Sequence, residues 1–140
     1  MRNACKILFC ILVIAGTALI YAWPRLKMGL ASSAHYTQQD IQKYDYYTPD
    51  ILKNMPRISA RYEFDYANIS GPASAFIFTI KFYGTRETDK INLYLDSTGY
   101  KKQATCFVEA VCWQGHDPKE VITVGDSSDP DTVAVSVIQR

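Results

Sequence analysis

The residues best suited by type to covalent chemistry are Cys112 and His116, which stand four positions apart. A thiol nucleophile needs a base to take its proton, and histidine suits that task because its ordinary pKa lies near neutrality. Such a pair would define a small hydrolase. However, Gly115-His116-Asp117-Pro118 is typical of a turn, where a histidine is usually solvated. We therefore predict a protein without catalytic residues and keep the hydrolase as an alternative.

The cysteines at positions 106 and 112 are not expected to form a disulfide. In one extended strand they would lie roughly 20 Å apart, at about 3.3 Å per residue, whereas a disulfide needs Cα atoms within about 7 Å. The stretch from Phe107 to Val111 contains no Gly, Pro, Asn or Asp that would favour a chain reversal. We expect Cys106 and Cys112 to be small core residues.

Metal and cofactor chemistry find little support. The chain has two histidines, His35 and His116, and lacks a glycine-rich phosphate loop and a CxxC pair. Asp126, Asp129 and Asp131 form an acidic loop, but no glutamate follows at the spacing of a calcium loop. We predict no metal, no cofactor and no small-molecule ligand.

The charge distribution argues against nucleic acid as a partner. Although the net charge is +1, four of the 15 basic residues (Arg2, Lys6, Arg25 and Lys27) flank an apolar stretch, and all 14 acidic residues follow it. Residues 28–140 thus carry 11 basic and 14 acidic side chains, a net charge of −3. A mildly acidic domain lacks the basic surface that a phosphate backbone requires.

Aromatic residues are the best candidates for a binding surface. Tyr44, Tyr46 and Tyr47 form a cluster, and tyrosines are enriched at protein–protein hot spots. Packing of a helix on a sheet would explain at least two of the three. The residues we select as candidates are Tyr44, Tyr46, Tyr47, Trp113 and His116.

The stretch ILFCILVIAGTALIYAW, residues 7–23, predicts a membrane anchor. Its seventeen residues carry no charge, and as a helix they reach roughly 25 Å, the lower edge of spanning length. Tyr21 and Trp23 suit the membrane interface, and Pro24 closes the stretch. A cleaved signal peptide is the alternative, with Ser32 and Ala34 before the cut. We expect an anchor with flanks at 1–27, a spacer at 28–35 and a folded domain at 36–140.

The domain is expected to begin with two short helices. Thr37 and Asp40 have the spacing of a capping box, and Ile41, Tyr44 and Tyr47 then recur at helical spacing. A second helix is expected to start at Thr48-Pro49-Asp50, before Pro56.

Alternating side chains then predict strands. The period of two is clear at 61–66 and 75–83, where Phe76, Phe78, Ile80 and Phe82 are expected to be core. Further strands are expected at 90–95, 101–113, 120–124 and 132–138, with a hairpin turn at 96–99. The predicted class is α+β: a single twisted antiparallel sheet of five to six strands, with the helices on its apolar face.

One family resemblance follows from turn glycines and apolar alternation over about 60 residues. Ile69-Ser70-Gly71-Pro72-Ala73-Ser74-Ala75, the apolar strand after it, Gly84, a second apolar stretch and Gly99 resemble the small membrane-anchored family that includes a cytochrome-oxidase assembly factor and a mitochondrial inner-membrane translocase subunit. Tyr100 stands where that family has a tryptophan, and charged residues 85–89 replace its glycine-rich hairpin. The resemblance implies a non-enzymatic binding module with one N-terminal anchor.

We therefore expect a single-pass membrane protein that binds a protein partner, with its C-terminal domain on the non-cytoplasmic side. A toxin-neutralising immunity protein of the bacterial envelope is the alternative within binding proteins.

Overall fold

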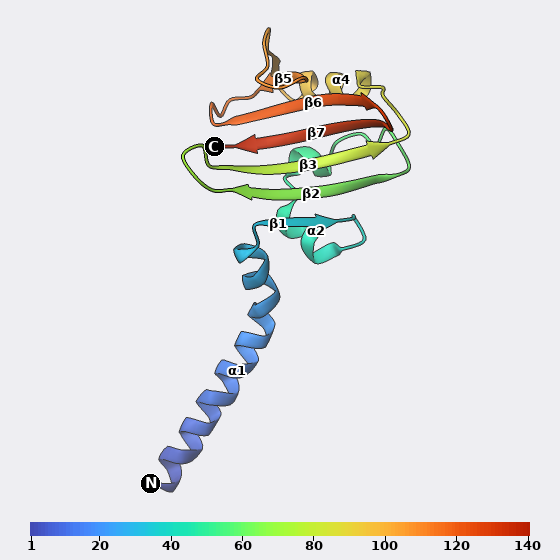
Figure 1. Ribbon diagram of the computed structural model, residues 1–140. Coiled ribbons are helices and arrows are strands. Elements are labelled where there is room, and N and C mark those ends of the chain that lie inside the picture. The colour runs from blue at the N-terminus through green and yellow to red at the C-terminus, as the bar shows by residue number, and fades with distance from the viewer. The chain divides into compact units, whose positions relative to one another are not determined.

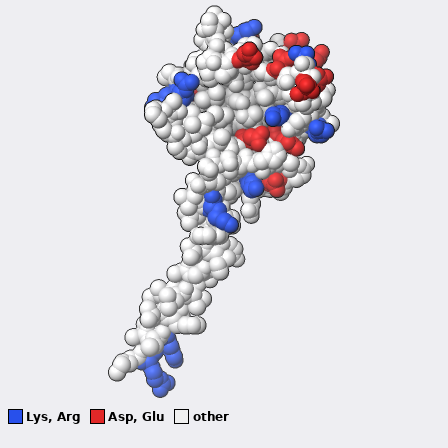
Figure 2. Space-filling view, viewed as in Figure 1, with Lys and Arg blue, Asp and Glu red and all other residues white.

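The computed structural model describes residues 1–140 and divides into two compact units, Met1–Ala31 and Ser32–Arg140. The first unit is the helix α1 (Arg2–Leu30), which is long and apolar enough to span a membrane or to act as a signal sequence. Figure 2 shows basic side chains towards both ends of this helix and an uncharged surface between them. The helix continues past residue 27, so the expected spacer at 28–35 is divided between α1 and the first strand.

The second unit is an α+β domain, as predicted, but its antiparallel sheet has seven strands rather than five or six (Figure 1). The spatial order is β1-β2-β3-β7-β6-β5-β4, which leaves β1 and β4 as the edge strands. The strands are β1 (Ser33–Tyr36), β2 (Tyr62–Ile69), β3 (Ala75–Tyr83), β4 (Lys101–Lys102), β5 (Val111–Gln114), β6 (Glu120–Ser128) and β7 (Asp131–Gln139).

The core lies on one face of this sheet. Alternation places Phe64, Ile80 and Val135 side by side in neighbouring strands, and all three are fully buried. Helices α2 (Ile41–Tyr47), α3 (Asp50–Lys53) and α4 (Asp89–Ser97) add further apolar side chains to the core. These are Tyr47, Leu52, Ile91 and Leu95.

The predicted core of β3 is half confirmed. Ile80 and Phe82 are fully buried, but Phe78 is half-buried and Phe76 is 46% exposed. Phe76 lies opposite Asn68 in β2 and Gln139 in β7, both polar. The rings of α2 pack instead on Phe64 and Tyr66, farther from the β2–β3 turn. The strand was predicted correctly, but helix coverage of its first residues was not.

Residues 90–95 were wrongly predicted as a strand, because they form the middle of α4. Ile91 and Leu95, which are four residues apart, are fully buried, whereas Leu93 is 70% exposed. Apolar residues at positions 91 and 95 fit a helix, in which residues i and i+4 lie on the same side. They also fit a strand, in which every second residue lies on the same face, so six residues do not distinguish the two. The predicted hairpin turn is the end of this helix, where Tyr100 N–H donates to the Leu95 carbonyl (3.1 Å) and Gly99 has a positive φ of 95°.

The expectation of one strand over 101–113 was also wrong. The short strands β4 and β5 are separated by a loop, residues 103–110, and a disulfide joins Cys106 to Cys112 with Cα atoms 5.2 Å apart. A straight strand over 101–113 would hold the two cysteines too far apart for this bond, but the loop brings them together. The chain reverses without a turn residue, helped by a hydrogen bond from Gln103 N–H to the Cys112 carbonyl (2.8 Å).

Candidate functional site

A groove of about 480 Å³ separates one face of α4 from β4 and β5. Asp89, Asn92, Leu93 and Asp96 line it from α4. Their i, i+3, i+4, i+7 spacing places them on one side of a helix. From the strands come Lys102 and Trp113, which are paired across β4 and β5.

Trp113 is held in place by the sheet. It lies opposite Ile122 in β6, on the core side, and only 4% of its surface is exposed. Its indole Nε1 is buried and has no hydrogen-bond acceptor. An indole nitrogen can only donate, so its bonding capacity is unused.

Asn92 shows the same feature from the other wall. Its amide nitrogen is 3.4 Å from the Thr88 hydroxyl oxygen, but its buried Oδ1 has no donor. Asn92 Oδ1 and Trp113 Nε1 are the two buried side-chain polar atoms without a partner in this chain, and both residues line the groove. Leaving such an atom buried without a hydrogen bond lowers the free energy of unfolding by about 1–3 kcal/mol.

The charged groups of the groove are unpaired as well. Asp89, Asp96 and Lys102 are exposed and make no ion pair. By contrast, Arg86 bonds to Asp126 (2.6 Å) on the same domain. The groove therefore presents two exposed carboxylates and one ammonium group, and two of the residues that line it also carry a buried amide oxygen and a buried indole N–H without partners.

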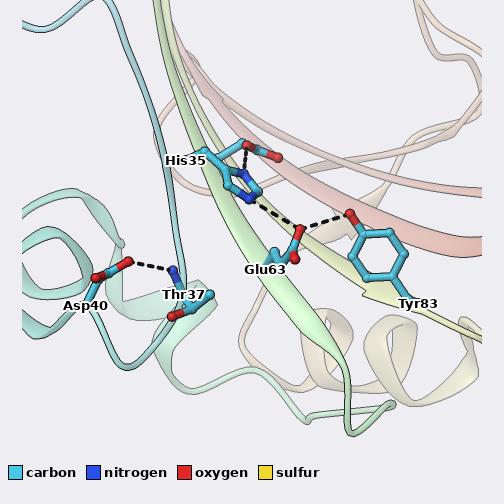
Figure 3. A network of polar contacts seen from close by, with 6 residues as sticks. His35, Thr37, Asp40, Glu63 and Tyr83 are labelled. Atoms are coloured by element: carbon cyan, nitrogen blue, oxygen red, sulfur yellow. Dashed lines mark hydrogen bonds and ion pairs between the residues drawn. The ribbon is translucent and has the colours of Figure 1, made fainter.

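A second polar cluster lies around His35 in β1 (Figure 3), on the face of the sheet opposite to the one that carries the buried Tyr36 and Phe64. The histidine Nδ1 is 2.6 Å from Asp65 Oδ1, and Nε2 is 3.4 Å from Glu63 Oε2. Glu63 also accepts a hydrogen bond from the Tyr83 hydroxyl (3.1 Å). The hydrogen bond to Asp65 raises the pKa of His35 above its usual value, with further help from the charges of both carboxylates.

This cluster fits a structural role. His35 and Asp65 are direct partners in the β1–β2 register, so their ion pair adds to the pairing of the edge strand. The atoms of the cluster already bond to one another, which leaves less capacity for a ligand than the groove has.

The predicted tyrosines lie in α2, and most of their ring surface packs within the domain. Tyr47 is buried and stacks on Tyr66, with ring centroids 4.4 Å apart. Tyr44 packs edge-on against Phe64, and its hydroxyl accepts a hydrogen bond from Arg57 (3.2 Å). Tyr46 is 47% exposed. Of the five predicted binding residues, only Trp113 lines the groove.

The Cys112 and His116 pair does not form a nucleophilic site in this structure. The sulfur of Cys112 is bonded to Cys106, so it carries no thiol. His116 is exposed in the turn between β5 and β6 and makes no hydrogen bond or ion pair. No group of three or more His, Cys, Asp or Glu side chains is placed to hold a metal ion.

The acceptors on α4 were missed at the sequence level because residues 90–95 were assigned to a strand. In a strand, Asp89 and Asn92 would point to opposite faces, whereas in a helix positions 89, 92 and 96 share one side. The polar i, i+3, i+7 spacing was therefore the available signal.

No family model, no curated protein and no solved structure matches this chain.

Proposed function

We propose that this protein is a membrane-anchored protein-interaction module whose partner docks in the groove beside α4. One observation carries the proposal: both unpartnered buried polar atoms of the chain belong to residues that line this groove. Folding gains nothing from leaving these atoms unbonded, so their coincidence in one groove favours a site that a partner completes.

The apolar contact of the groove supports the same function. Leu93 is 70% exposed in the middle of the polar α4 wall. A partner that covers this side chain would exclude water from the hydrogen bonds around it, which strengthens them. A binding role of this kind also agrees with the family resemblance described above, although residues 90–95 are helical here.

The anchor gives such a module its place of action. Retained in a membrane, α1 would hold the domain at the bilayer and raise its effective concentration towards partners in the same membrane.

The Cys106–Cys112 disulfide supports a non-cytoplasmic location for the domain, because disulfides persist in oxidising compartments. A reporter fused after Arg140 and assayed on both sides of the membrane tests this location. Activity on the cytoplasmic side would contradict it.

Photo-crosslinking from within the groove tests the docking site. A photoreactive amino acid replaces Leu93 in the full-length protein, and Ile41, which is 68% exposed on α2, is the matched control position. After illumination of intact membranes, we expect a discrete protein adduct from position 93 and none of the same mass from position 41. Adducts of equal yield at both positions, or none from position 93, would refute the proposal.

The identity of the adduct then separates forms of the same function. A secreted toxin would indicate a neutralising immunity protein, whereas a subunit of a membrane complex would indicate an assembly module.

A further inference from the structure

The two walls of the groove differ in hydrogen-bonding character. On α4, Asp89, Asp96 and the unpartnered Oδ1 of Asn92 can only accept. On the strands, the Lys102 ammonium group and the Trp113 indole N–H can only donate. The charged groups and the unpartnered polar atoms of the groove are thus segregated by secondary-structure element, with acceptors on α4 and donors on the strands.

The acceptor wall has the length of a short peptide segment. From Asp89 to Asp96 the helix rises by about 10 Å, at roughly 1.5 Å per residue. An extended chain covers that distance in about three residues. Side chains at alternate positions of such a segment lie on the same side, roughly 7 Å apart.

A bare ion would not match this arrangement. Lys102 opposes the entry of a free cation, while Asp89 and Asp96 oppose a free anion. A group of atoms that carries both signs satisfies the two walls at the same time. The acidic character of the domain, with a net charge of −3 over residues 28–140, favours approach by the basic part of such a group.

Building on the proposed function, we infer that the protein partner inserts a segment with a basic side chain and a carboxylate at nearby positions. The guanidinium or ammonium group bonds to Asp89, Asp96 and the Asn92 amide oxygen. The carboxylate accepts from Lys102 and from the indole N–H of Trp113. Each buried polar atom that the folded chain leaves unbonded gains a partner in this complex.

The indole of Trp113 provides the readout. The chain has two tryptophans, and the other, Trp23, lies in α1. Full-length protein with Trp23→Phe, in detergent micelles, therefore gives one indole N–H resonance. The probes are acetyl-Arg-Leu-Glu-amide and two matched peptides in which either the Arg or the Glu is replaced by Gln.

We expect the two-charge peptide to shift the indole resonance saturably, with each single-charge peptide binding about tenfold more weakly, as expected for loss of one charge-assisted hydrogen bond. Asp96→Asn should weaken the two-charge peptide by about the same factor. Asp129→Asn, which removes an exposed charge without a contact in the β6–β7 turn, should leave binding unchanged. A backbone spectrum of each variant verifies that the fold is intact.

Equal titration curves for the three peptides, or an indole resonance that none of them moves, would overturn the inference. The proposed function is judged separately by the adduct from position 93. An adduct together with charge-independent peptide curves would refute the zwitterionic segment and leave the docking site standing. Loss of the adduct would refute both.

Discussion

The two edges of the sheet satisfy their polar groups to different degrees. At the β1 edge, the buried Tyr36 hydroxyl is bonded to Thr48 (2.8 Å), and Tyr62 donates to Gln38 (2.6 Å). His35 is bonded to Asp65 as well. At the β4 edge, Trp113 Nε1 and Asn92 Oδ1 are buried without a partner.

The edges also differ in regularity. The edge strand β1 pairs with β2 along four rungs, from Ser33 with Ala67 to Tyr36 with Phe64. On the other side, β4 has two residues, β5 has four, and a disulfide closes the loop between them. Under the proposed function, the β1 side provides stability, whereas the unbonded buried polar atoms beside the groove lower the stability of the β4 side.

The largest effect is expected for Phe64→Ala, on the stable side. Phe64 is fully buried, and its ring lies 5.2 Å from that of Tyr44 and 5.5 Å from that of Tyr36. Its truncation should lower the free energy of unfolding by about 3–5 kcal/mol. Urea denaturation followed by Trp113 fluorescence, in the Trp23→Phe protein, measures this. Leu93→Ala, in the groove, should change the same quantity by less than about 0.5 kcal/mol.

Comparable losses for Phe64→Ala and Leu93→Ala would erase the contrast between the two sides. The groove would then be part of the core.

Removal of the disulfide should have the next largest effect. Cys106 and Cys112 are six residues apart, and release of so short a loop costs about 2 kcal/mol of unfolding free energy. The Cys106→Ala, Cys112→Ala double variant tests this by urea denaturation. Cys5→Ser and Cys10→Ser in both proteins prevent thiol exchange with the free cysteines. An unchanged midpoint would show that this bond does not support the β4 side.

A small pH effect is expected at the β1 edge. The pKa of His35 is raised in the folded state, so protonation favours folding. The stabilisation is full below about pH 6.5, the usual histidine pKa, and it disappears as pH rises through the folded value. Because the His35 side chain is 60% exposed, the effect should stay below about 1 kcal/mol.

The contribution of this pair is measured from the free energies of unfolding of the His35→Gln variant and the unaltered protein, each at pH 5.5 and at pH 8. The variant should lose more stability at the lower pH. His116→Gln, which replaces an exposed histidine outside this pair, is the matched control variant. The reverse pH dependence would exclude the His35–Asp65 pair as its source.

The sequence was informative where strands are long and side chains alternate. Residues 61–66 and 75–83 carry an unambiguous period of two, and both form strands there. Ambiguity arose in short stretches: Ile91, Leu93 and Leu95 fit a strand, although only the first and third are buried. The choice between the two structures depends on packing against other elements, including the bond from the Tyr94 hydroxyl to the Ile51 carbonyl (2.8 Å).

The candidate site was out of reach for a related reason. Trp113 was a candidate by residue type, but its groove exists only because 89–97 is a helix and 103–110 is a loop. Residues 107–111 beside the disulfide include no residue that is typical of turns, so the chain reversal could not be predicted from the sequence. His35 was assigned to a spacer, whereas its pairing with Asp65 joins residues thirty positions apart.

The most direct test of the account combines stability and binding in the variant Asn92→Leu. Leucine is of similar size and replaces a buried amide oxygen that has no donor. The change also removes the contact from the amide nitrogen to Thr88, but at 3.4 Å that contact is long, so the free energy of unfolding should rise by about 1 kcal/mol. The same change should abolish the partner adduct formed from position 93.

Asn54→Leu is the matched control. Asn54 donates to the Asp50 carbonyl (3.0 Å) outside the groove, so its replacement should lower stability slightly and leave the adduct intact. We expect a more stable Asn92→Leu protein that no longer captures its partner. A less stable Asn92→Leu protein that still forms the adduct would contradict the proposed role of the groove.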